Sequence, residues 1–84
     1  MKKLSIIILS YNVKKLLLDC LASIPRNKNW EIIVVDNAST DGSAKIANIR
    51  NKTNLGFAKA NNIAIKKSKG EFILLLNPDM IVYP

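Results

Sequence analysis

The sequence contains no histidine and a single cysteine, Cys20, among its 84 residues. One cysteine cannot form an internal disulfide, and without histidine the chain cannot build a Cys/His zinc site. Nucleophilic couples of the Ser-His-Asp and Cys-His kinds are excluded for the same reason. Acid–base chemistry therefore has to come from carboxylates, lysines or tyrosines, or from outside this chain.

Glycine and proline are also scarce, with three of each, while 49% of the residues are hydrophobic and 23% are charged. This composition is typical of a globular chain rather than a disordered or collagen-like one. Domains usually run from about 50 to 250 residues, so the length leaves room for one core only. The sequence thus predicts a single domain over residues 1–84.

Acidic residues number six against 13 lysines and arginines, which gives a net charge of +7. Such a charge favours anionic partners, namely phosphates, nucleic acid or an acidic membrane face, and a solvated basic surface also accounts for it. The aromatic residues, one Trp, two Tyr and two Phe, are far apart. They do not interleave with the basic residues as a stacking platform would, so no nucleic-acid partner is expected.

Long hydrophobic runs are absent, and no apolar run approaches the ~18 residues that a transmembrane helix needs. The first nine residues imitate a signal peptide, but the apolar run breaks at Ser10 and no small-residue cleavage site follows. The sequence therefore predicts a soluble, cytoplasmic chain, with peripheral association to a membrane face as its one membrane contact.

Three short apolar runs predict strands, at residues 6–9, 32–35 and 73–76, with a weaker one at 46–49. They are continuous rather than alternating, which is typical of parallel strands buried on both faces. Helical patterns lie between them. The order β-α-β-α-(β)-α-β predicts an α/β fold with a parallel, three-layer sheet and right-handed crossovers.

Helices are expected over residues 16–24 and 57–67, and a shorter one begins at residues 41–43. Asn12 is the expected cap of the first helix, which must end before Pro25. Gly70 is the expected stop signal of the second. Ser39 and Asp41 precede the short helix and are predicted to cap it rather than to touch a ligand.

Polar stretches follow the predicted strands, at residues 10–12, 36–42 and 77–79. Ligands of open parallel sheets bind at the carboxyl ends of the strands, and Asp36 and Asp79 both lie there. No Gly-rich dinucleotide or P-loop motif is present. A diphosphate held through Mg²⁺ or Mn²⁺ is the alternative, because these metals need only one or two protein carboxylates. Asp79 is the candidate ligand, and a turn residue after Pro78 is the competing interpretation.

Four segments carry a resemblance to a known family: residues 4–12 (LSIIILSYN), 32–43 (IIVVDNASTDGS), 54–62 (NLGFAKANN) and 70–79 (GEFILLLNPD). In this order they resemble the start of a family 2 glycosyltransferase of GT-A fold, over nearly the whole chain. The resemblance implies a Rossmann-like N-terminal half of that fold. It also implies that the chain binds a nucleotide-diphosphate sugar.

The resemblance also implies roles for individual residues. Tyr11 would lie beside the base, Asp36 and Asn37 at the base or ribose, and Asp79 would be the metal aspartate. The donor-binding residues expected from the motifs are Ser10, Tyr11, Asp36, Asn37, Gly56 and Asn77. Gly56 is expected to permit a tight approach of the backbone at the entrance of a helix.

The sequence departs from the family pattern in three respects. Asn37 stands where many relatives carry a second Asp, and Asn77-Pro78-Asp79 replaces an Asp-x-Asp arrangement. These variants are similar to those of rhamnosyl-type and related cell-surface polysaccharide transferases. The chain also ends directly after the metal motif. We therefore expect a truncated donor-binding half without an acceptor site.

No catalytic residue can be nominated, because Glu31 and Glu71 begin strands at the far end of the sheet and a base must lie within about 3 Å of the acceptor hydroxyl. The expected function is sugar transfer, hexosyl or rhamnosyl, to a cell-surface polysaccharide or lipid-linked acceptor. A non-enzymatic nucleotide-binding remnant is the alternative. A basic protein that binds polyanions without metal is a third possibility.

The last predicted strand, residues 72–76, is apolar on both faces, unlike the blunted edge strands of stable monomers. We expect a homo-oligomer that buries this strand. In the competing arrangement, residues 80–84 fold back over the edge.

Overall fold

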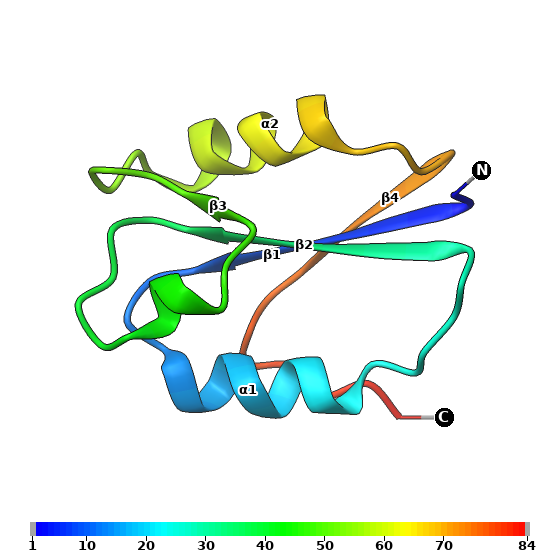
Figure 1. Cartoon of the computed structure of the whole chain (residues 1–84), viewed down its shortest axis with the longest axis horizontal. Coiled ribbons are helices and arrows are strands. Elements are labelled where there is room, and N and C mark those ends of the chain that lie inside the picture. The colour runs from blue at the N-terminus through cyan, green and yellow to red at the C-terminus, as the bar shows by residue number, and fades with distance from the viewer. Residues whose placement is uncertain (1, 84) are drawn as a thin grey trace.

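Four parallel strands form one sheet with the order β3-β2-β1-β4. The computed structural model describes residues 2–83. The strands are β1 (Leu4–Ser10), β2 (Trp30–Asp36), β3 (Ile49–Arg50) and β4 (Phe72–Leu76). Helix α1 (Lys14–Ser23) lies on one face of the sheet and α2 (Phe57–Lys67) on the other, and the short 3-10 helix η1 (Ser43–Lys45) precedes β3 (Figure 1). The predicted parallel α/β fold with three layers is confirmed.

The continuous apolar runs of the strands supply two cores, one on each face of the sheet. Ile6 and Ile8 of β1 pack with Leu17 and Cys20 of α1. Ile7 points to the other face and packs in the second core, which also contains residues of β2 and α2. Successive side chains of a strand alternate between faces, so a strand covered on both sides has to be apolar throughout.

The amino end of the sheet is joined by a small polar network around Ser5. The Ser5 hydroxyl donates to Glu31 Oε2 at 2.6 Å and accepts the N–H of Gly70 at 2.8 Å. The Ser5 hydroxyl holds the pKa of Glu31 below its usual value, together with the N–H of Lys69. Glu31 therefore contributes to the fold at the end of the sheet opposite to the strand carboxyl ends.

Gly70 does not act as the predicted stop signal, because α2 ends at Lys67 with Ser68 as its C-cap. Its role is close packing. A Cβ atom at Gly70 would lie 2.4 Å from the backbone nitrogen of Ser5, a distance that real Cβ contacts do not show. Glycine is required here because two backbones pass each other.

Helix α1 begins differently from the prediction. Its N-cap is Val13, and no capping side-chain bond is made there. Asn12 instead adopts a left-handed backbone (φ 53°), and its Oδ1 accepts the N–H of Thr40 at 2.7 Å. The first N–H of the helix, from Lys14, donates to Asp41 Oδ2 at 2.9 Å. The prediction that Asn12 caps α1 is thus wrong. The N–H of Lys14, which has no partner inside the helix, is bonded by Asp41 from the loop after β2.

Asp41 also contacts the start of η1, so its carboxylate accepts hydrogen bonds from the first residues of two helices. Its Oδ1 accepts the N–H of Ser43 at 3.0 Å and the Ser43 hydroxyl at 2.6 Å. The Ser43 hydroxyl, the Ser43 N–H and the Lys14 N–H lower the pKa of Asp41. Ser39 does not cap η1, because its hydroxyl accepts the N–H of Asn12 at 2.9 Å.

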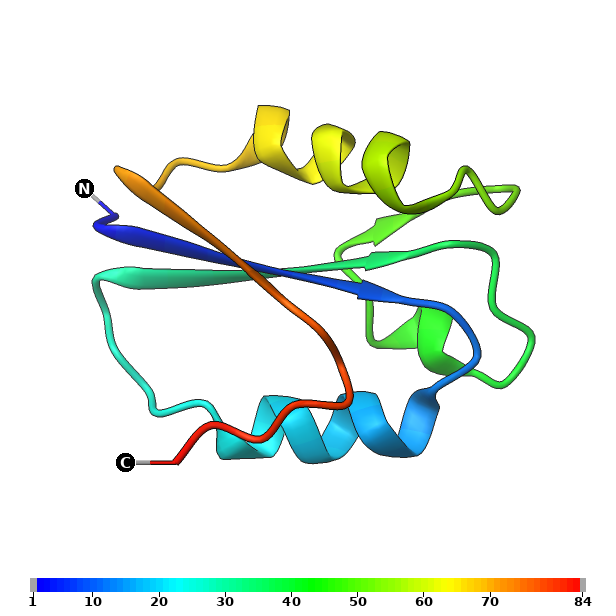
Figure 2. The ribbon, with the colours of Figure 1, turned by 180° about the vertical axis from the view of Figure 1, so that it is seen from behind.

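Strand β4 forms one edge of the sheet, and four of its five residues are exposed: Phe72, Ile73, Leu74 and Leu75. The segment after β4 turns away and runs along α1 (Figure 2). The Val82 N–H donates to the Ser23 hydroxyl at 2.9 Å. The described part of the tail, residues 80–83, therefore packs beside α1 rather than over the β4 edge, and Pro84 lies outside the described residues. No helix within residues 2–83 is long and apolar enough to span a membrane.

We expect Asp41→Asn to destabilise the protein near neutral pH, because the amide keeps only one acceptor oxygen for three donors. A carboxylate whose folded-state pKa is lowered contributes stability above its unfolded pKa and loses that contribution as pH falls through the folded value. The difference in unfolding free energy between wild type and variant should therefore shrink below pH 3.8, the ordinary value of Asp41. Urea unfolding at pH 7 and at pH 3.5 measures it.

Asp19→Asn is the matched control, because Asp19 contacts only Lys15 in an exposed pair on α1. Such pairs contribute about 0–1 kcal/mol, so this variant should stay close to wild type at both pH values. An Asp41→Asn deficit of equal size at both pH values would contradict the role assigned to the carboxylate.

Candidate functional site

The polar segments after β1 and β2 start side by side at the carboxyl edge of the sheet. Ser10 and Asp36, the last residues of the two strands, are partners in the parallel register. The N–H of Asn37 donates to the Ser10 carbonyl at 2.9 Å. Strand β4 ends at Leu76, which pairs close to the end of β1, with Ile8. The structure therefore brings the first two polar segments together at one edge, whereas the third leaves the end of β4 towards α1, where the Asn77 carbonyl lies 4.0 Å from Cys20 Sγ.

Asp36 is fully buried, with 0% of its surface exposed. Its Oδ2 accepts the N–H of Ser39 at 2.8 Å, and its Oδ1 accepts the Ser43 hydroxyl at 3.2 Å. Both bonds go to the segment that follows β2. The carboxylate therefore fixes the path of residues 37–43 from inside.

Asn37 is also buried, with 2% exposed, and it binds the segment before α2. Its Oδ1 accepts from the side-chain amide of Asn51 at 2.9 Å and from the N–H of Leu55 at 3.4 Å. Its own amide donates to the Gly56 carbonyl at 3.3 Å. Residues 51–56, of which 54–56 begin the third motif, are thereby attached to the same edge of the sheet.

Gly56 lies in this segment for a reason other than the predicted one. No atom lies within 4 Å of the position that its Cβ would occupy, so the expected tight approach is wrong. Its backbone has φ 83°, in the left-handed region that favours glycine. Gly56 is therefore needed for the direction in which the chain enters α2.

Two non-glycine residues of the described chain, Asn12 and Ala38, have a positive φ, of 53° and 67°. Both lie in the segments that follow β1 and β2 at this edge. Such backbone strain costs about 1–3 kcal/mol per residue and gathers at binding and catalytic sites. The strained positions thus coincide with the place where parallel sheets bind ligands.

The remaining predicted site residues differ in exposure. Tyr11 is exposed over 49% of its surface, and Asn77 and Asp79 are exposed as well. Ser10 is fully buried, yet its hydroxyl oxygen has no hydrogen-bond partner within residues 2–83. A buried polar atom without a partner is rare in native proteins, where a bound ligand or an ordered water commonly supplies the missing bond.

Asp79 makes no hydrogen bond or ion pair within the described chain, so its carboxylate is free. It lies close enough to α1 to affect Cys20. Burial raises the pKa of the Cys20 thiol, and the negative charge of Asp79 raises it further.

Among residues 2–83 no group of three or more Asp, Glu, His or Cys side chains could hold a metal ion. Mg²⁺ and Mn²⁺ do not need such a group, because substrate phosphates and waters supply most of their oxygen ligands. One exposed carboxylate without a protein partner fits this requirement. Asp79 is therefore a residue that could hold such an ion.

The sequence did not reveal the partners that hold these loops. Ser43 and Asn51 bind the buried Asp36 and Asn37, and Asn12 joins the first loop to the second. The Asn12 contact links residues 28 positions apart. Capping preferences consider only neighbours along the chain, so they assigned Asn12 to its own helix.

Comparison with known proteins identifies the family. The glycosyl transferase family 2 model matches residues 5–84. A poly(ribitol-phosphate) beta-N-acetylglucosaminyltransferase, TarS, from Staphylococcus aureus (strain Mu50 / ATCC 700699) is 34% identical over 94% of this chain and 16% of its own length. A poly(ribitol-phosphate) beta-glucosyltransferase from Bacillus spizizenii is 38% identical over 92% of this chain and 15% of its own.

The putative glycosyltransferase EpsE of Bacillus subtilis (strain 168) is 33% identical over 98% of this chain. That match covers 34% of EpsE, so the chain spans between about a sixth and a third of these relatives. The family model covers nearly all of the sequence and includes the polar segments that follow β1, β2 and β4. This chain belongs to glycosyl transferase family 2.

Proposed function

We propose that this chain binds a nucleotide-diphosphate sugar together with Mn²⁺ or Mg²⁺, as the donor-binding part of a glycosyltransferase. The observation that carries the proposal is the free carboxylate of Asp79, three residues after the carboxyl end of β4. When bound, the metal would neutralise the diphosphate and ease the departure of the nucleotide. Asp79 is the protein group that holds it.

The nucleoside part of the donor would lie against the first two loops. The exposed ring of Tyr11 offers an apolar face to the base. Asp36 and Asn37 are buried and bonded to their own chain, so we assign their action on the base or ribose to the backbone that they hold in place. Ser10, Gly56 and Asn77 complete the proposed donor site.

We further propose that the donor is a hexosyl nucleotide and that the acceptor is a cell-surface polymer. Two relatives are named as transferring N-acetylglucosamine and glucose to poly(ribitol-phosphate). The net charge of +7 complements a phosphate polymer or a lipid-linked phosphate at an anionic membrane face. We therefore place the chain in the cytoplasm, in peripheral contact with the membrane.

No residue of the described chain is assigned as the catalytic base. Glu31 and Glu71 lie at the start of β2 and just before β4, away from the carboxyl edge. A nucleotide-binding module without transfer activity is therefore the second candidate. A turnover assay with a nucleotide sugar distinguishes the two, because only an enzyme releases the nucleotide repeatedly.

The described edge of β4 leads us to propose a homo-oligomer in which a second copy covers that strand. Within residues 2–83 its backbone has no partner strand on the outer side, and its exposed side chains are apolar on both faces. Exposed edges of this kind associate with other strands. The simplest closed assembly is a two-fold dimer with two copies of β4 side by side.

Binding of a pyrimidine nucleoside diphosphate is expected to be weak and dependent on Mn²⁺. Asp79→Ala should weaken binding in Mn²⁺ by about tenfold, or about 1.4 kcal/mol, and should leave the residual binding in EDTA unchanged. Calorimetric titration with uridine diphosphate, with Mn²⁺ and with EDTA, measures both. Asp19→Ala removes an equal charge from α1 and should bind like wild type. Equal affinity of Asp79→Ala and wild type at saturating Mn²⁺ would overturn the metal assignment.

Self-association is expected to depend on the exposed side chains of β4. Leu75→Lys places a charge on the strand and should return the protein to a 9.3 kDa monomer, because inward charges block strand pairing. Sedimentation velocity at several concentrations measures the change. Leu18→Lys, at a similarly exposed position of α1, is the control and should leave the dimer intact. A wild-type chain that stays monomeric at high concentration contradicts the proposal.

A further inference from the structure

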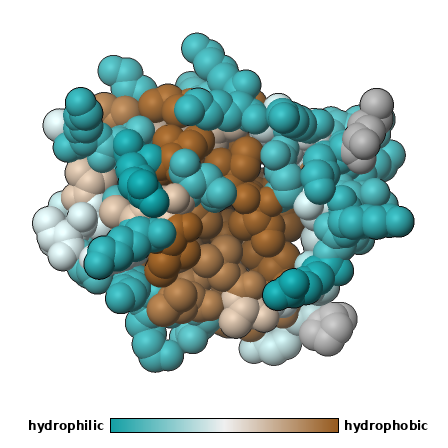
Figure 3. All heavy atoms as spheres, viewed as in Figure 1, coloured by the Kyte–Doolittle hydropathy of each residue, from teal (hydrophilic) through white to brown (hydrophobic). Residues whose placement is uncertain are grey.

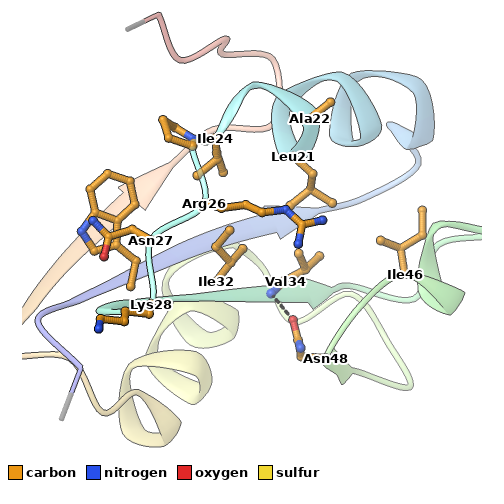
Figure 4. A pocket seen from close by; sticks show the side chains of 12 residues that line it. Leu21, Ala22, Ile24, Arg26, Asn27, Lys28, Ile32, Val34, Ile46 and Asn48 are labelled. Carbon is orange, nitrogen blue, oxygen red and sulfur yellow. Dashed lines mark hydrogen bonds between the residues drawn. The ribbon is translucent and has the colours of Figure 1, made fainter.

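A groove opens beside the first half of β2, between the end of α1 and η1. Its volume is about 760 Å³, within the usual range of small-molecule sites. Apolar side chains form its floor: Leu21, Ile24, Ile32, Val34 and Ile46. Figure 4 shows them converging from the α1 end, from β2 and from the segment after η1. On the face with β2 in front, a broad hydrophobic area is bordered by hydrophilic atoms (Figure 3).

The groove is open because the connection between β2 and β3 is short. The crossovers before and after it carry helices of ten and 11 residues, whereas this one carries only the three residues of η1. Strand β3 pairs with Val35 and Asp36, and no other strand of the described chain lies beside the first half of β2 on that side. The floor is therefore left uncovered by helix and by strand.

The polar groups at the groove are positive and have no counter-charge. The Arg26 side chain extends across the floor towards Leu21 and Val34 (Figure 4), and Lys28 lies at the rim. Neither side chain makes a hydrogen bond or ion pair within residues 2–83. The side-chain oxygen of Asn48 is already used, because it accepts the N–H of Val34 at 2.7 Å.

The acids of the chain do not supply that counter-charge. Asp19 and Glu71 pair with Lys15 and Lys3. Glu31 binds Ser5 and Lys69, Asp36 and Asp41 lie at the carboxyl end of β2 and in the loop that follows it, and Asp79 lies after β4. The groove therefore combines an apolar floor with two unneutralised cations.

We propose that this groove binds a single-chain amphiphile with an anionic head, a long-chain carboxylate, whose hydrocarbon lies on the floor while Arg26 holds the carboxylate and Lys28 adds positive charge at the rim. The two exposed cations favour an anionic head over a neutral one, and a small polar anion would leave the apolar floor in water. Arg26 can bind a carboxylate with two parallel N–H donors, a geometry that Lys28 lacks.

The site is separate from the proposed donor site and does not depend on it. Trp30 and Ile32 stand at the start of β2, whereas Asp36 ends the strand at the opposite edge. A variant can therefore lose binding of the amphiphile and still bind the nucleotide, and the two losses can be measured separately.

Trp30 allows a direct test, because it lines the groove and is the only tryptophan of the chain. A dodecanoate brominated on its chain, used below its micelle concentration, should quench Trp30 fluorescence saturably. Each buried CH₂ contributes about 0.8 kcal/mol, so brominated decanoate, two CH₂ shorter, should bind about 15-fold more weakly. Brominated dodecanol and dodecylamine, with neutral and cationic heads, should bind at least about fivefold more weakly than the carboxylate.

Substitutions at Arg26 and at Ile32 distinguish binding of the ligand's carboxylate from binding of its hydrocarbon. Arg26→Gln should weaken binding of the carboxylate about fivefold and leave binding of the alcohol unchanged. Lys66→Gln removes an equal charge from the exposed end of α2 and should have no effect. Ile32→Ser should weaken both ligands, and Ile46→Ser, on the opposite wall, gives the same information if the first variant does not fold.

Equal binding of carboxylate and alcohol to wild type would overturn the assignment of Arg26 and Lys28. If Ile32→Ser and Ile46→Ser are both quenched as strongly as wild type, the ligand does not bind in this groove. If Ile32→Ser instead dissociates a dimer in sedimentation, a second copy fills the groove and the proposal is wrong.

Discussion

The carboxylate of Asp36 is buried, and no cation within residues 2–83 is bonded to it, so hydrogen-bond donors must stabilise its charge. Burial of an unpaired charge is costly, and the N–H of Ser39 and the hydroxyl of Ser43 are the donors that offset this cost. Both donors come from the segment that follows β2. The loop therefore has to fold around the carboxylate, and the rest of the carboxyl edge is built on that loop.

The contacts spread from this loop in two directions. Ser39, Thr40 and Asp41 bind the backbone or side chain of the segment that opens α1. On the other side, Asn37 holds the segment that opens α2. A change at Asp36 is thus transmitted to the starts of both helices. This explains why the strained residues Asn12 and Ala38 can persist, because each lies between segments that are bonded on either side.

The sequence predicts the sheet well because the information is local. Continuous runs such as residues 32–35 define buried strands, and the position of each polar segment follows from where a run ends. What the sequence missed involves contacts between distant segments. Asn12 is an excellent cap by type but is used by Thr40, and Gly70 is required by Ser5, 65 residues away. The sequence places Gly56 at the entrance of α2, but the reason for glycine there is its positive φ, and periodicity does not report a backbone angle.

The two uncovered apolar surfaces of the molecule differ in charge, and this difference decides what can cover each. At β4 the nearby charges neutralise one another, since Lys3 pairs with Glu71 at 3.0 Å and lies over the ring of Phe72. A neutral strand edge can meet a second copy of itself without repulsion. At the groove, Arg26 and Lys28 have no such partner, and a second copy would bring two more cations to them. The groove therefore favours an anionic ligand over self-association, while β4 favours the reverse.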